Sequence, residues 1–84
     1  MKYAVLLKAS AERELDRLPS RMHERIVRHL ARLAEQPRPV GSRKLHGTDA
    51  YRIRVGDYRV LYEVDDRRAK VTVYSVVHRR EVYR

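Results

Sequence analysis

One segment constrains the fold more than any other: residues 50–64 read AYRIRVGDYRVLYEV. Polar and apolar residues alternate on both sides of Gly56-Asp57, and alternation with a period of two is typical of β-strands. A Gly-Asp pair between two such runs predicts a tight turn. We therefore expect a β-hairpin in this part of the chain.

The same period brings the arginines of this hairpin together. Arg52 and Arg54 share one face of the first strand, and Ile53 and Val55 share the other. We expect Arg59, from the second strand, to join the two arginines on an exposed face. Because guanidinium groups bind phosphate through paired hydrogen bonds, this row suggests a surface that holds a phosphodiester backbone.

The charge of the chain points to an anionic partner. Its 84 residues carry a formal net charge of +9 at pH 7, which attracts nucleic acid, an acidic protein or an anionic membrane surface. The membrane is disfavoured because no long amphipathic cationic segment is present. Arginine outnumbers lysine, which suits phosphate geometry, although a codon bias toward arginine would give the same ratio.

Length and composition predict one small cytoplasmic domain, residues 1–84. The chain has no cysteine, which excludes disulfides and thiolate metal sites and fits a reducing compartment. The apolar run at residues 3–7 is stopped by Lys8 and is too short for a signal peptide or a membrane span.

The remaining segments predict an α+β fold. The first is a strand at residues 2–8, which is apolar on both faces and is therefore expected inside the sheet. Two helices follow, one at residues 11–18 and one that begins at Ser20 and ends at residues 36–39. A loop at residues 41–49 precedes the hairpin, and a buried strand at residues 69–77 comes after it. The N-terminal strand and an α-helical hairpin thus precede a three-stranded antiparallel meander, which completes a four-stranded sheet. Helices covering one face leave the other face to the arginines.

The second predicted helix carries an arginine stripe, formed by Arg21, Arg25, Arg28 and Arg32. The simplest interpretation is a solvated helix face. The alternative is a docking surface for a large RNA or an acidic partner chain. Both interpretations stay open at this stage.

The end of the last predicted strand supplies groups that can do chemistry. His78, Arg79 and Tyr83 would bring an imidazole, a guanidinium and a phenol close to the arginines of the hairpin. Such a set suffices for RNA cleavage without a metal. One group accepts the proton of the ribose 2′-hydroxyl, cations hold the charge on the phosphate, and an acid protonates the leaving 5′-oxygen.

No motif predicts a metal or a cofactor. The chain lacks a glycine-rich phosphate loop and zinc-type ligand spacing. His23, His29 and His46 are interpreted as surface or boundary residues because no second ligand set accompanies them. We expect neither a metal site nor a cofactor.

Four motifs together resemble the RelE/ParE toxin superfamily, nearer the RelE-type mRNA interferases: residues 44–47, 51–54, 56–62 and 77–83. The resemblance spans nearly the whole chain and implies a fold similar to small microbial ribonucleases. It implies a toxin of a type II toxin-antitoxin system, an endoribonuclease that cleaves mRNA in the ribosomal A site and inhibits translation. It also implies a cognate antitoxin that neutralises the toxin and forms an oligomer with it.

By position, the resemblance assigns the family's catalytic set to Arg52, Arg54, Arg59, Arg79 and Tyr83. The best-known RelE-type proteins have lysines in place of Arg52 and Arg54, and a guanidinium is a poor general base. We therefore add His78 to the catalytic set as the group that exchanges a proton, with Glu63 and Glu81 as alternatives, while Tyr83 stacks on a base or assists. We expect the RNA to be bound by Lys44, Arg52, Arg54 and Arg80.

Two other functions stay open. A ParE-type inhibitor of DNA gyrase would share the fold, although Arg79 and Tyr83 argue against it. A noncatalytic basic module would use the same arginines only to bind RNA or the ribosome.

Overall fold

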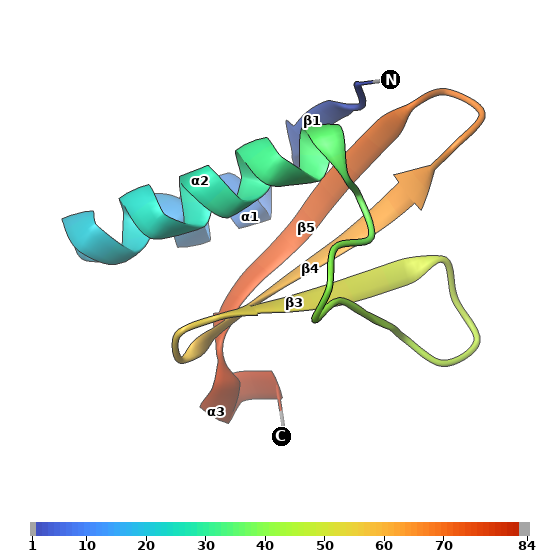
Figure 1. Cartoon of the computed structure of the whole chain (residues 1–84). Coiled ribbons are helices and arrows are strands. Elements are labelled where there is room, and N and C mark those ends of the chain that lie inside the picture. The colour runs from blue at the N-terminus through green and yellow to red at the C-terminus, as the bar shows by residue number, and fades with distance from the viewer. Residues whose placement is uncertain (1, 83–84) are drawn as a thin grey trace.

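The computed structural model describes residues 2–82, which form one mixed sheet and three helices (Figure 1). The elements are β1 (Ala4–Leu7), α1 (Ala9–Asp16), α2 (Ser20–Glu35), β2 (Arg43–Lys44), β3 (Ala50–Val55), β4 (Tyr58–Asp65), β5 (Lys70–His78) and α3 (Arg79–Val82). The sheet order is β1-β5-β4-β3-β2. β1 is parallel to β5 and every other neighbouring pair is antiparallel, which confirms the α+β class and the antiparallel meander.

The sheet differs from the predicted one in two respects. It has five strands rather than four, because Arg43 and Lys44 pair with β3 inside the segment predicted as a loop. A two-residue strand is too short to show an alternating pattern. The first strand lies at the edge of the sheet rather than in its interior. Leu6, which suggested a second buried face, is 45% exposed.

One apolar core joins both long helices to the sheet. α1 and α2 lie on the same side of the sheet (Figure 1). α2 places Ile26, Leu30 and Leu33 at helical spacing against the alternating apolar residues of the strands, and all three are buried. The other side of β3, β4 and β5, here called the open face, carries neither α1 nor α2.

The turn between β3 and β4 depends on a glycine. Gly56 has a φ of +60°, whereas Asp57 is not among the residues with a positive φ, which is the pattern of a type II′ hairpin turn. A Cβ atom at position 56 would lie 3.0 Å from Met22 Cε and 3.2 Å from a terminal nitrogen of Arg25. The turn therefore favours glycine for its backbone angle, and a Cβ atom there would displace the ends of the Met22 and Arg25 side chains by a few tenths of an ångström.

This double requirement can be measured with two alanine substitutions. We expect Gly56→Ala to lower the free energy of unfolding by about 1–2 kcal/mol for the backbone angle and by a further roughly 0.5–1.5 kcal/mol for the displacement of the Met22 side chain. Gly47 also has a positive φ, +75°, but its Cβ would meet nothing within 4 Å, so Gly47→Ala should cost only the backbone part. Urea denaturation of both variants measures the difference, and equal losses would show that contact with α2 contributes nothing.

Candidate functional site

The β3–β4 hairpin places three arginines on the open face. Arg54 and Arg59 are direct partners across the two strands, and Arg52 is the partner of Leu61. Partners in an antiparallel pair share a face, and residues two apart on one strand also share a face. Arg52, Arg54 and Arg59 thus project on the side predicted from the alternation of the sequence.

The predicted exposure of Arg59 is wrong. Its exposed fraction is only 2%, whereas Arg54 is exposed and Arg52 is half-buried. Arg59 lies on β4, between β3 and β5, and α3 contacts both β4 and β5. The strand period predicts the face on which a side chain lies, but not how deeply its neighbours cover it.

Four arginines meet in one cavity of about 340 Å³ at the turn end of the hairpin. This arginine cavity is lined by Arg54, Gly56, Asp57, Tyr58, Arg59, Arg79 and Arg80. Arginines from two strands and from α3 therefore line one small volume. Among residues 2–80, whose side chains the structure describes, Asp57 is the only carboxylate that lines it. Such a concentration of positive charge favours an anion that offers several oxygen atoms, such as a phosphodiester.

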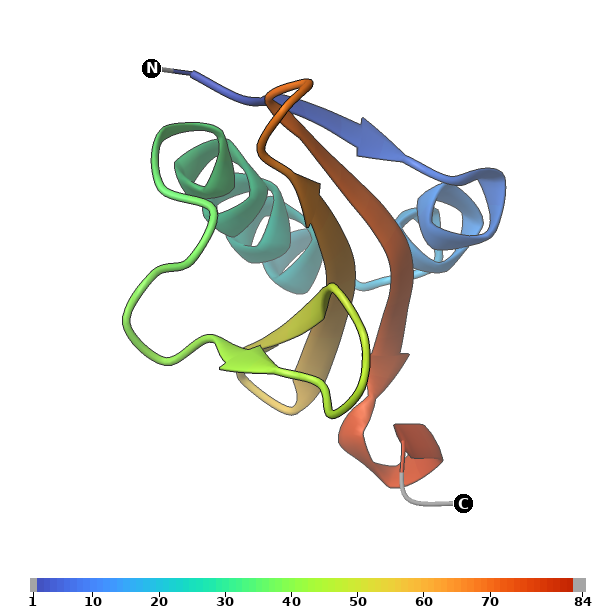
Figure 2. The same ribbon diagram turned by 90° about the vertical axis from the view of Figure 1, so that its right-hand side faces the viewer.

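The turn also positions the arginine that follows β5. The backbone N–H of Arg79 donates a hydrogen bond to the carbonyl of Asp57 at 2.8 Å, and Arg79 Nε lies 3.9 Å from Asp57 Oδ1. Figure 2 shows α3 at the end of β5, close to this turn. An exposed ion pair adds little stability, so its main effect is to direct the guanidinium. No sequence pattern predicts this role of Asp57, because its contact with residue 79 follows only from the strand register.

His78 does not line the arginine cavity. It is the cross-strand partner of Tyr58, and its ring packs edge-on against the Tyr58 ring with centroids 5.3 Å apart. His78 Nδ1 lies 3.3 Å from the backbone nitrogen of Arg80, which can only donate. In the neutral ring the proton is then on Nε2. The imidazole therefore lies next to a residue of the cavity wall rather than among the arginines.

The other predicted site residues are spread more widely. Arg80 lines the arginine cavity, while Lys44 lines a different one. Tyr83 lies outside the described residues, so its role stays a prediction. Arg21, Arg25, Arg28 and Arg32 are exposed on α2, and the choice between a solvated face and a docking surface stays open.

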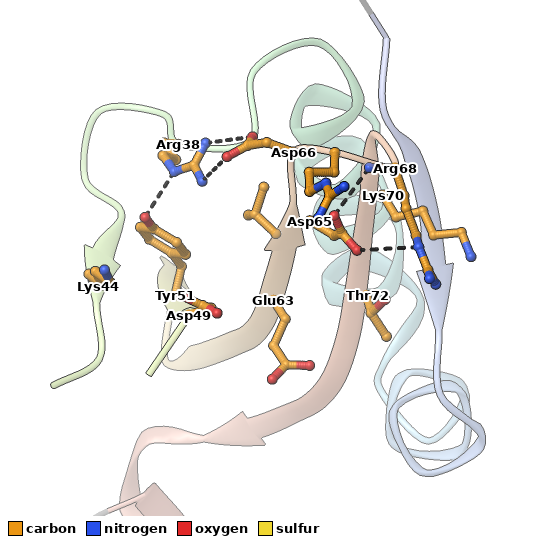
Figure 3. A pocket seen from close by; sticks show the side chains of 12 residues that line it. Arg38, Lys44, Asp49, Tyr51, Glu63, Asp65, Asp66, Arg68, Lys70 and Thr72 are labelled. Carbon is orange, nitrogen blue, oxygen red and sulfur yellow. Dashed lines mark hydrogen bonds and ion pairs between the residues drawn. The ribbon is translucent and has the colours of Figure 1, made fainter. Parts of the chain in front are cut away.

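A second cavity, of about 680 Å³, lies toward the other end of β4 (Figure 3). This mixed-charge cavity has Lys44, Asp49 and Tyr51 on one side and Arg68 and Lys70 on the other, with the Glu63 carboxylate between them. Its lining contains both acidic and basic side chains, so it differs from the arginine cavity. Its lining favours a ligand that carries both hydrogen-bond donors and acceptors.

Hydrogen bonds around Asp66 hold the wall of the mixed-charge cavity. Arg38 donates two of them to Asp66, at 3.1 and 2.9 Å, and a third to the hydroxyl of Tyr51 at 2.9 Å. Tyr3 donates to Asp66 at 2.6 Å. These bonds, Arg38 first and Tyr3 second, lower the pKa of Asp66. They fasten the loop after α2 and the N-terminal segment to the β4–β5 turn.

A buried tyrosine also holds the loop after α2 in place. Tyr62 is fully buried, and its hydroxyl donates to the carbonyl of Pro37 at 2.8 Å. Burial raises the pKa of Tyr62 to about 12, so the phenol keeps its proton at neutral pH. Its ring also stacks on Tyr51, with centroids 5.9 Å apart.

The lowered pKa of Asp66 predicts a pH-dependent contribution to stability. This contribution is present above the unfolded-state pKa of about 3.9 and is lost as the pH falls through the lower folded-state value. We expect Asp66→Asn to lower the urea midpoint at about pH 7 and to have a much smaller effect at about pH 3. Asp49→Asn is the control, because Asp49 forms no hydrogen bond or ion pair through its carboxylate within residues 2–82. A deficit of equal size at both pH values would contradict the assignment.

The structure also bears on metals and membranes. Within residues 2–82, no three side chains of the metal-ligating types His, Asp and Glu lie close enough together to hold a metal ion. In that same range, no helix has both the length and the apolar character to cross a membrane.

Comparison with known proteins follows from this fold and site. Residues 5–83 match the family described as ParE toxin of type II toxin-antitoxin system, parDE. Toxin RelG of Mycobacterium tuberculosis is 36% identical over 88 residues, which cover 100% of this chain and 99% of that protein. Toxin RelE of the same organism is 31% identical and covers 98% of this chain and 87% of its own length.

Solved structures of related proteins share the fold. The archaeal RelE–RelB complex of Pyrococcus horikoshii superposes with a TM-score of 0.86 at 30% identity, covering 94% of this chain and 97% of the matched one. The isolated E. coli RelE toxin superposes with a TM-score of 0.81 at 34% identity, covering 96% and 90%. The similarity therefore extends over almost the whole chain in both sequence and structure.

Proposed function

Because the chain belongs to the RelE/ParE superfamily of toxins of type II toxin-antitoxin systems, we propose that it is an endoribonuclease that cleaves mRNA. One observation carries the proposal: four arginines line a single small cavity on an otherwise open sheet. Cleavage of RNA requires a place where a phosphodiester is held while negative charge grows on it, and the arginine cavity is suited to that task.

The chemistry is a transfer within the RNA strand. The ribose 2′-oxygen attacks the adjacent phosphorus, the bond to the 5′-oxygen breaks, and the products are a 2′,3′-cyclic phosphate and a 5′-hydroxyl. A base removes the proton of the 2′-hydroxyl and an acid returns a proton to the leaving 5′-oxygen, so the overall proton count is unchanged. The protein's main contribution is to orient the strand and to stabilise the charge on the non-bridging oxygens.

We expect each arginine to bind the RNA or stabilise the phosphate charge in a way that depends on how exposed its side chain is. Arg54 and Arg79 are exposed and would contact the phosphate oxygens, with Arg52 and Arg80 binding the neighbouring backbone. Arg59 is buried beside Arg54, and an arginine side chain keeps its charge in a protein. Arg59 would therefore act through its charge, by raising the positive potential at the phosphate from a buried position in the cavity wall.

An antitoxin is part of the same proposal. The solved relatives include the E. coli RelBE toxin-antitoxin complex and the RelE–RelB complex of P. horikoshii. We propose that this chain likewise binds a cognate antitoxin, and that its formal net charge of +9 favours a partner with acidic segments. The ribosome would be the second partner, presenting mRNA to the open face.

Inhibition of DNA gyrase is the second candidate function. It is favoured by the family match, whose description names a ParE toxin, and it needs no phosphate-cleaving centre. Induced expression in bacteria separates the two. Discrete cuts in mRNA with arrested translation support the ribonuclease, whereas an SOS response with blocked DNA replication supports the gyrase inhibitor.

A matched pair of variants tests the arginine cavity. We expect Arg54→Ala to reduce cleavage of ribosome-bound mRNA by about 10²–10³-fold, because one cation that stabilises the growing charge is lost. Arg13→Ala removes the same charge from an exposed position on α1 and should cleave like the parent protein. RNA 5′-end mapping measures the cuts, and equal cleavage by both variants would remove the arginine cavity from the mechanism.

A second pair of measurements tests His78. If its imidazole exchanges a proton during cleavage, His78→Ala should remove one ionisation from the pH dependence of the rate. His46→Ala, in the exposed loop after β2, is the control and should leave the pH profile as it is. An unchanged profile in His78→Ala would leave His78 only its packing against Tyr58.

A further inference from the structure

A carboxylate lies on the open face, on the same strand as the buried arginine. Arg59, Leu61 and Glu63 occupy alternate positions of β4 and so share this face. At roughly 3.3 Å per residue, Glu63 lies about 13 Å along the strand from Arg59. This span corresponds to a few nucleotides of a single strand, since stacked nucleotides repeat at about 3.4 Å. An RNA held in the arginine cavity can therefore reach Glu63.

The surroundings of Glu63 make it available to a ligand. Its side chain is exposed and, within residues 2–82, forms no hydrogen bond and no ion pair. Glu63 lines the mixed-charge cavity, and Figure 3 shows its side chain between Asp49 on one side and Thr72 and Lys70 on the other. A carboxylate at this place repels phosphate, so it weakens non-specific RNA binding. Its chemistry suits a contact with a base instead.

The hydrogen-bonding chemistry of a carboxylate selects one base. An ionised carboxylate has two oxygens that only accept hydrogen bonds. The Watson–Crick edge of guanine presents two adjacent donors, the N1–H and the 2-amino group, whereas adenine, cytosine and uracil each place an acceptor beside a single donor. Bases in single-stranded RNA expose this edge to side chains. Only guanine can thus engage both oxygens of the carboxylate at once.

We propose that Glu63 is a specificity-determining residue that selects guanine at a nucleotide near the cleaved phosphate. This inference rests on the proposed ribonuclease function, because the arginine cavity sets where the strand lies. Lys70 lies two residues from Thr72, the cross-strand partner of Glu63, and so shares the open face with the carboxylate. It would hold a phosphate next to the selected base. The basic groups supply affinity and Glu63 supplies discrimination.

Binding to RNA that cannot be cleaved tests the inference directly. The probes are short 2′-O-methyl oligonucleotides of uridine with one guanosine, adenosine or inosine, and binding is followed by fluorescence anisotropy. We expect the parent protein to bind the guanosine probe about 5- to 150-fold more tightly than the adenosine probe. Inosine keeps the N1–H and lacks the 2-amino group, so its probe should bind with intermediate affinity.

The charge-neutral variant Glu63→Gln should abolish this preference, because an amide has one acceptor atom and one donor group and so cannot pair an oxygen with each of the two guanine donors. Glu12→Gln removes the same charge from an exposed position of α1 and should keep the preference. Thermal unfolding of both variants verifies that each remains folded. A preference for guanosine that survives in Glu63→Gln, or its absence from the parent protein, would overturn the inference.

Mapping of cleavage sites on ribosome-bound mRNA distinguishes this inference from the proposed function. Cuts that lose their association with guanine in Glu63→Gln support both. Cuts with the same base preference in parent and variant overturn the role of Glu63 and leave the ribonuclease intact. No cuts at all, with guanosine preference still lost in the binding assay, overturn the ribonuclease and retain the base contact.

Discussion

The site depends on the tight turn between β3 and β4, where the backbone angle favours glycine. Gly56 takes a positive φ and approaches Met22 and Arg25 of α2, and the next residue, Asp57, accepts the backbone hydrogen bond of Arg79. One turn therefore sets the register that pairs Arg54 with Arg59, fixes the hairpin against a helix, and anchors the start of α3. The turn at Gly56-Asp57 therefore positions the residues of β3, β4 and α3 that line the arginine cavity.

Placing several arginines close together costs free energy because their charges repel one another. The fold reduces this repulsion in two ways. Arg54, Arg79 and Arg80 are exposed to water, which weakens their mutual repulsion. Asp57 lies beside Arg79 and offsets part of the remaining charge. At the other end of β4, acidic residues are interspersed with basic ones, as in the pair of Arg38 with Asp66. The open face thus changes from strongly basic to mixed along one strand.

Sequence patterns predicted the layout of the fold and which face carries the arginines, but not the edges of the sheet or depth of burial. The alternation around Gly56-Asp57 and the helical spacing of Ile26, Leu30 and Leu33 arise from local geometry, which a sequence records directly. β2 is too short to leave a period, and the edge position of β1 depends on its pairing with β5. The burial of Arg59 and the contact of Asp57 with Arg79 arise from neighbours distant in sequence.

The parallel pairing of the first strand with the last has a consequence for how the molecule comes into being. Ala4 pairs with Lys70 and Leu7 with Val73, so the N-terminal strand finds its neighbour only after nearly the whole chain has been synthesised. Contacts between such distant residues slow folding, because loop closure precedes the energy gained on contact. Until then the edge of β5 at residues 70–73 lacks its neighbouring strand.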